Sequence, residues 1–196
     1  MSDLMKKIRK NSTNPYIDKL MDSQLLDRTD LIQTDIPALN IALSGDVCGG
    51  FGSGIVTIAG KSKHFKTLFA LEMTKAYLQQ NEDAILVFFD SEFGSPREYF
   101  KSFGDATDRI LHVPVTTVEE FRTEMMNQLE GLSRGDKVVF MLDSIGNLAS
   151  MKEFDDAVSG KQTVDMTRAK VVKSIFRLIT ARLKLKDLTL FTINHT

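Results

Sequence analysis

The chain has 196 residues, of which 42% are hydrophobic and 26% are charged, as in ordinary globular domains. This length is enough to bury a core, so the chain most simply forms one domain with a small appendage. The formal net charge of -1 argues against a uniformly basic nucleic-acid-binding protein, although it is compatible with a local basic groove.

Cysteine usage and apolar runs bear on the compartment. No apolar run approaches the roughly 18 residues of a membrane-spanning helix, so we expect no membrane contact. The single cysteine, Cys48, cannot form an internal disulfide, and the sequence shows no apolar signal segment. Both features indicate a reducing cytoplasm. The three histidines and the cysteine lie far apart in the sequence, which predicts no zinc site.

The first thirty residues differ in character from the rest of the chain. Ser2 can cap a short amphipathic helix in which Leu4 and Ile8 lie four residues apart among lysines and an arginine. An Asn-Pro step ends this helix, and a second short helix is expected near Leu20. Such segments bury little surface on their own. We therefore expect 1–30 to dock on the main domain or on another molecule, with a solvated tail as the alternative.

From residue 31 onwards, apolar runs alternate with segments of helical spacing. We predict strands over 55–59, 84–89, 110–113, 138–142 and 188–193, and helices over 68–80, 96–103, 117–132 and 164–183. The apolar runs are continuous, which is typical of a parallel sheet covered by helices on both faces. Ligands of such sheets bind at the carboxyl ends of the strands. The segment 31–196 is therefore predicted to be one α/β domain.

The stretch GKSKHFKT lies between the first predicted strand and its helix. It fits the P-loop pattern G-x-x-x-x-G-K-[ST], except that Phe65 replaces the second glycine. Gly60 would form the turn, Lys66 would bind the β- and γ-phosphates, and Thr67 would bind magnesium. The candidate nucleotide-binding residues here are Gly60, Lys61, Ser62, Lys63, His64, Phe65, Lys66 and Thr67. The alternative is an ordinary strand-to-helix loop with a surface lysine.

Polar side chains end three further predicted strands. Asp143 could hold the water shell of magnesium opposite Thr67, although an aspartate there could also be a turn residue or a helix cap. Asp90 and Glu92 follow another strand, and either could orient the water that attacks a nucleotide. Residues two apart on a strand point the same way, so the spacing does not choose between them. His195, at the tip of the last strand, could sense the γ-phosphate.

In combination, IALSGD before the P-loop, FFDSEFG, VVFMLDSIGNLAS, DMTRAK and INHT resemble the RecA-type recombinases over residues 32–196, and most closely their phage members. The resemblance implies a P-loop (RecA-like) three-layer α/β/α fold with a mainly parallel sheet, and ATP and Mg²⁺ as cofactors. Phage members also carry Phe before the P-loop lysine. The resemblance further implies that Glu92 activates water, that Tyr99 stacks on adenine, and that Asp143 is the Walker B carboxylate. His195 stands where bacterial members have a glutamine that couples the γ-phosphate to DNA binding.

The function implied by this resemblance is that of an ATP-dependent, single-stranded-DNA-binding recombinase. Such a protein is a DNA-dependent ATPase that assembles with itself into a helical filament and promotes homologous pairing and strand exchange in recombination, repair and replication. Its expected partners include a recombination mediator and a single-stranded-DNA-binding protein in the host cytoplasm. Residues 1–30 would dock on the neighbouring protomer. The segment 150–164, with Lys152 and Lys161, corresponds to the first DNA-facing loop, although its acidic residues also fit a merely solvated loop.

Members of this family continue beyond the position of Thr196 with a second DNA loop and further strands. We therefore expect the core to be incomplete at its C-terminal side. Two other functions fit the same motifs. One is another RecA-fold ATPase, such as a replicative helicase domain, and the other is a nucleotide-binding polymerisation module without strand exchange.

Overall fold

The computed structural model describes residues 2–26, 30–160 and 167–196, which fall into two compact units, 1–30 and 31–196. In the smaller unit, helix α1 (Asp3–Asn11) begins at Ser2, whose hydroxyl accepts the Met5 N–H, as predicted. The predicted second helix is wrong, because only the 3-10 turn η1 (Leu20–Asp22) forms there. So short a segment gains too few hydrogen bonds to offset the cost of starting an α-helix.

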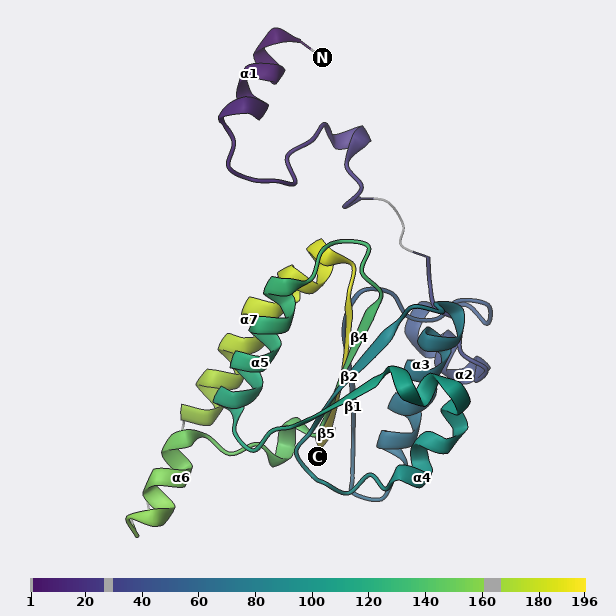
Figure 1. Cartoon of the computed structure of the whole chain (residues 1–196), viewed down its shortest axis with the longest axis vertical. Helices are drawn as coiled ribbons and strands as arrows, with labels where there is room; N and C mark the ends of the chain where they lie inside the picture. The colour runs from purple at the N-terminus through teal and green to yellow at the C-terminus, as the bar shows by residue number, and fades with distance from the viewer. Residues whose placement is uncertain (1, 27–29, 161–166) are drawn as a thin grey trace. The chain divides into compact units, whose positions relative to one another are not determined.

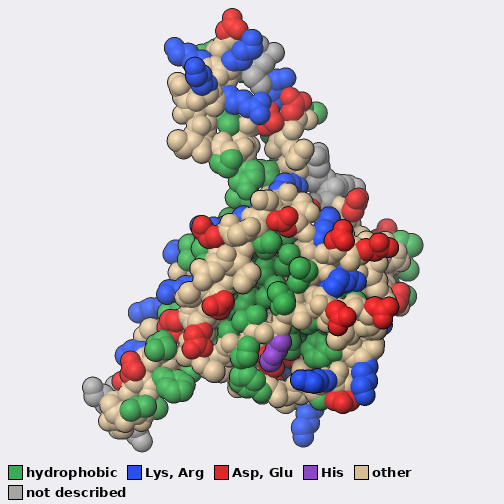
Figure 2. Space-filling view, viewed as in Figure 1, with side chains coloured by type: hydrophobic (Ala, Val, Ile, Leu, Met, Phe, Trp, Pro, Cys, Tyr) green, Lys and Arg blue, Asp and Glu red, His purple; other side chains and the backbone are tan. Residues whose placement is uncertain are grey.

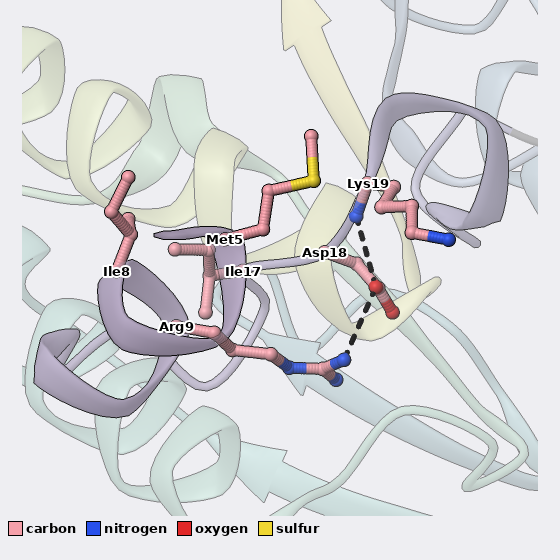
Figure 3. Close-up of a pocket in the computed structure, with 6 residues that line it drawn as sticks. All are labelled: Met5, Ile8, Arg9, Ile17, Asp18 and Lys19. Atoms are coloured by element: carbon pink, nitrogen blue, oxygen red, sulfur yellow. Dashed lines mark hydrogen bonds and ion pairs between the residues drawn. The ribbon is translucent and has the colours of Figure 1, made fainter. Parts of the chain in front are cut away.

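The smaller unit has little core of its own. Apolar side chains of Met5, Ile8 and Ile17 line a small hollow beside an ion pair of 3.4 Å between Arg9 and Asp18 (Figure 3). The Asp18 carboxylate also accepts the backbone N–H of the next residue. Lysine and arginine side chains gather on the surface of this unit (Figure 2). It therefore presents both charged and apolar groups to the solvent.

The larger unit is built on a five-stranded sheet in which every neighbouring pair is parallel. The strand order is β1-β5-β4-β2-β3. The strands are β1 (Gly54–Gly60), β2 (Ile85–Asp90), β3 (Ile110–Pro114), β4 (Val138–Asp143) and β5 (Thr189–His195). The prediction of a parallel sheet is confirmed, with each strand within two residues of its expected bounds.

Helices cover both faces of this sheet (Figure 1). On one face lie α5 (Val118–Gly131) and α7 (Thr167–Lys186). On the other face lie α2 (Pro37–Ser44), α3 (Lys66–Gln80) and α4 (Arg97–Phe100). Helix α4 continues into the 3-10 segment η2 (Lys101–Arg109). Successive strand residues serve opposite faces, so Val87 and Phe89 pack with α5 and α7, whereas Leu86 and Phe88 pack with α3. The predicted three-layer α/β/α architecture is confirmed.

One helix replaces part of a predicted loop. The segment expected to be the first DNA-facing loop contains α6 (Met151–Val158), which begins at a capping box of Ser150 and Glu153. The sequence pattern S-x-x-E was the available signal for this start. Phe154 and Val158 are exposed on α6, where Figure 2 shows hydrophobic side chains at the surface. Residues 161–164 of that segment, which include Lys161, lie outside the described residues.

The sheet brings the polar strand ends together at one edge. Gly60 of β1 pairs in register with His195 of β5, and Asp90 of β2 pairs with Asp143 of β4. Because β5 lies between β1 and β4, His195 stands between the P-loop and the carboxylates. Among the described helices, none combines the length and hydrophobicity that crossing a membrane requires.

Candidate functional site

A cleft of about 430 Å³ opens at the carboxyl edge of the sheet. Its walls come from the P-loop, from the turn after β2, and from the ends of β4 and β5. The residues that line it are Ser62, Lys63, His64, Phe65, Lys66, Thr67, Leu68, Glu92, Gly94, Ser95, Tyr99, Asp143, Ile193 and His195. Of the residues predicted for the site, Gly60, Lys61 and the alternative carboxylate Asp90 are outside this lining. The volume is within the usual range for pockets that hold small molecules.

Lys66 places a cation at the start of α3. Its side chain is buried, and Nζ donates to the carbonyl oxygen of Lys61 at 2.8 Å. The same nitrogen lies 3.3 Å from Nδ1 of His195. The positive end of α3 adds to this charge, so the arrangement suits a phosphate group.

Phe65 occupies a backbone conformation that favours glycine. Its φ and ψ are 55° and 20°, in the left-handed region, and Lys63 in the same loop also has a positive φ of 64°. The Phe65 ring is 68% exposed, so packing within this chain does little to offset the backbone cost. The loop thus keeps the shape of a glycine-containing P-loop despite the substitution.

Thr67 and Asp143 face each other across the cleft. Thr67 Oγ1 donates to Asp143 Oδ2 at 2.8 Å. In the described part of the chain, the buried Asp143 Oδ1 has no hydrogen-bond partner. The pKa of Asp143 is raised to about 6, mainly by burial of the carboxyl group. The hydrogen bond from Thr67 lowers this pKa, and the negative charges of Glu92 and Asp90 raise it further. An unsatisfied carboxylate oxygen beside a hydroxyl fits the needs of a hydrated Mg²⁺, which takes oxygen ligands.

The two carboxylates after β2 have different surroundings. Asp90 Oδ1 accepts the backbone N–H groups of Glu92, at 3.1 Å, and Phe93, at 2.8 Å, while Oδ2 lies 3.1 Å from Nε2 of His112. Asp90 is 4% exposed and thus acts as a support for the turn. Glu92 lines the cleft instead. Of these two carboxylates, Glu92 lies in the lining of the cleft, whereas Asp90 accepts hydrogen bonds within the turn.

Glu92 meets two donors inside the cleft. Ser144 Oγ donates to Glu92 Oε1 at 2.5 Å, and Nε2 of His195 lies 2.5 Å from the same oxygen. Burial by itself would raise the pKa of Glu92. The hydrogen bonds of Ser144 and His195, with the charges of His195 and Lys66, outweigh burial and leave that pKa below its ordinary value. Glu92 is therefore ionised at neutral pH and can accept a proton.

Sequence reasoning missed the small polar residues around this pair. The Ser91 hydroxyl donates to the carbonyl oxygen of Ser144 at 2.7 Å and accepts the Ser144 N–H at 2.9 Å, while Asn147 donates to the Ser91 carbonyl at 2.8 Å. The only signal was that serines directly follow Asp90 and Asp143 in two strand-end motifs. Tyr99 was predicted, and it lines the same cleft, 42% exposed.

A P-loop on β1 and carboxylates at the ends of neighbouring parallel strands define a nucleotide-binding α/β domain. The RecA N-terminal domain family matches residues 1–196, so the chain belongs to the RecA family. It is 45% identical over 196 residues to the recombination and repair protein (UvsX) of Enterobacteria phage T4. That match covers all of this chain, which spans half the length of the phage protein.

Replacing Phe65 by glycine should stabilise the fold. Glycine adopts φ of about +55° without the clash that costs an L-residue roughly 1–2 kcal/mol, so we expect about 1 kcal/mol more unfolding free energy. Chemical denaturation measures this quantity. The control is Phe65→Ala, which removes the ring but keeps the strained Cβ, and equal stability of the two variants would contradict the interpretation.

Replacing Asp143 by asparagine should stabilise the ligand-free protein at alkaline pH. The folded chain holds this proton more tightly than the unfolded chain, so the contribution of Asp143 to stability is lost as pH rises through about 6. We expect Asp143→Asn to raise the free energy of unfolding by on the order of 2 kcal/mol at pH 8. This difference from the parent protein should disappear towards pH 4. Denaturation at both pH values tests this, with the exposed Asp105→Asn as control. An Asp143→Asn variant no more stable than the parent at pH 8 would refute it.

Proposed function

We propose that this chain is the nucleotide-hydrolysing part of an ATP-dependent recombinase that binds single-stranded DNA and carries out homologous pairing and strand exchange. The observation that carries the proposal is that Glu92, His195 and Lys66 form one continuous set of contacts at 2.5 and 3.3 Å, in a chain of the RecA family. The Lys66 cation, which would bind phosphates, and the Glu92 carboxylate, which would orient water, then lie in one cleft.

Nucleotide binding would rest on the P-loop. Lys66 supplies a buried cation for the phosphates, and the start of α3 supplies backbone N–H groups. Thr67 and Asp143 would hold Mg²⁺ through a hydroxyl and a carboxylate oxygen. When bound there, Mg²⁺ neutralises charge on the phosphate oxygens. Tyr99, half-exposed in the same cleft, offers a ring on which adenine could stack.

Hydrolysis would depend on Glu92 as the proton acceptor. Its pKa lies below the ordinary value, which keeps the carboxylate ionised at neutral pH and makes it a weaker base than an unperturbed glutamate. The ionised carboxylate would orient a water molecule and take its proton as the water attacks. Asp90 supports the turn that carries Glu92 by accepting two backbone N–H groups. His195 reaches both Glu92 and Lys66 from the tip of β5, which suits a residue that responds to the γ-phosphate.

Assembly and DNA binding complete the proposal. The unit 1–30 has exposed apolar residues on α1, including Leu4 at 67%, which would dock on a neighbouring protomer in a filament. The segment that begins with α6 would face DNA at the filament axis. A recombination mediator and a single-stranded-DNA-binding protein would act with the filament in the host cytoplasm.

Lys66→Ala should weaken ATP binding strongly. Loss of charge-assisted contacts to phosphate costs about 1.5–3 kcal/mol, so we expect roughly 10- to 100-fold weaker affinity. Equilibrium titration of nucleotide measures it. Lys61→Ala and Lys63→Ala, which remove exposed lysines from the same loop, are compared with Lys66→Ala, since these lysines could partly substitute for Lys66. Unchanged affinity in Lys66→Ala would disprove the P-loop assignment.

Glu92→Gln should separate binding from turnover. The amide is nearly isosteric but cannot take a proton, so turnover of ATP should fall by roughly 10²-fold or more while binding stays near normal. Turnover of the parent protein and of each variant is measured with and without single-stranded DNA. The comparison variant is Asp90→Asn, which keeps an oxygen acceptor for the turn. Full turnover in Glu92→Gln and a larger loss in Asp90→Asn would transfer the role to Asp90.

A further inference from the structure

The turn that follows β4, here called the η3 turn (residues 144–148), contacts the surroundings of both Glu92 and His195. Ser144, at its start, donates from Oγ to Glu92 Oε1 at 2.5 Å. Asn147 donates from Nδ2 to the carbonyl oxygen of the residue before Glu92 at 2.8 Å. Gly146 lies so close to β5 that a Cβ there would be 3.4 Å from Cδ2 of His195. The position of the η3 turn therefore helps to determine the positions of the Glu92 and His195 side chains.

A single side chain of α7 holds the η3 turn. Arg168 donates from Nε to the carbonyl oxygen of Leu148 at 2.6 Å. Its guanidinium also donates to the carbonyl oxygens of Ile145, at 2.7 Å, and Gly146, at 3.1 Å. Three backbone acceptors thus converge on two nitrogens of one planar guanidinium, a spread of donors that the single ammonium nitrogen of a lysine does not reproduce. Because the donor is charged, these are strong hydrogen bonds.

We propose that Arg168 is a positioning residue for nucleotide hydrolysis. By holding the carbonyl groups of the η3 turn, it keeps Ser144 against Glu92 and Gly146 against His195. The catalytic roles of Glu92 and His195 rest on the proposed function. The contacts between Arg168 and the η3 turn are independent of that proposal.

The fold does not depend on Arg168 alone. The side chain of Leu148, at the far end of the η3 turn, is 1% exposed. The next residue, Ala149, is tied to the start of α5 through the Val118 N–H, at 2.9 Å, and to the carbonyl oxygen of Thr116, at 3.3 Å. Replacement of Arg168 would therefore loosen the near part of the turn while its far end stays anchored. Variants at this position are expected to fold.

The first experiment reads the position of His195 without any need for turnover. The chain has only three histidines, so the side-chain nitrogen signals in an NMR spectrum are few, and His195→Gln assigns the relevant one. In Arg168→Lys the His195 signal should move, since the η3 turn beside the His195 ring is no longer held in the same place. The control is Arg182→Lys on the same helix, which contacts Met126 and Glu130 and not the η3 turn. That variant should leave the His195 signal in place.

The second experiment measures hydrolysis and binding separately in the full chain with ATP and ADP. In Arg168→Lys and Arg168→Gln, kcat should fall about 10-fold or more, as expected for small misplacement of reacting groups, with the Kd for ADP within about 2-fold of the parent. Unmoved His195 signals and unchanged kcat in both variants would overturn the proposal. Equal effects from Arg182→Lys would also overturn it. If the parent protein hydrolyses no ATP, the proposed function fails, and the NMR comparison still decides whether Arg168 positions the turn.

Discussion

The position of β5 between β1 and β4 is the constraint on which the site depends. Parallel pairing on both sides brings the tip of β5 level with the P-loop and next to the end of the carboxylate-bearing β4. His195 can then reach Lys66 with one ring nitrogen and Glu92 with the other. The hydrophobic layers on both faces of the sheet hold these strand ends in place.

The site is built at some cost to stability. Phe65 holds a left-handed backbone with its ring largely exposed, and Asp143 is buried with one oxygen that lacks a partner among the described residues. Both features are unfavourable in the ligand-free fold, and both lie where the proposed function would place a phosphate and Mg²⁺. Stored strain of this kind is typical of functional sites, and it is tolerated because the sheet and its helices supply enough buried surface.

Polar side chains connect the ends of β2 and β4 with the start of α7. Ser91 and Ser144 exchange hydrogen bonds between the ends of β2 and β4, and Arg168 brings α7 to the same place. The helix that bears Arg168 follows the segment proposed to face DNA. Two hydrogen bonds, from Arg168 to the η3 turn and from Ser144 to Glu92, join α7 to the carboxylate.

The sequence by itself determined the five strands, the P-loop and the polar residues at the strand ends, because continuous apolar runs and a glycine turn are local patterns. It also predicted the first capped helix, but it missed α2 and α6 and overestimated the structure near Leu20. Only the tertiary structure decided the strand order and the different surroundings of Asp90 and Glu92. The surroundings of Glu92 depend on hydrogen bonds from Ser144 and His195, which lie 52 and 103 positions away from it in the sequence. Contacts over such separations leave no periodic trace in the sequence, since they arise only when the sheet aligns its strand ends.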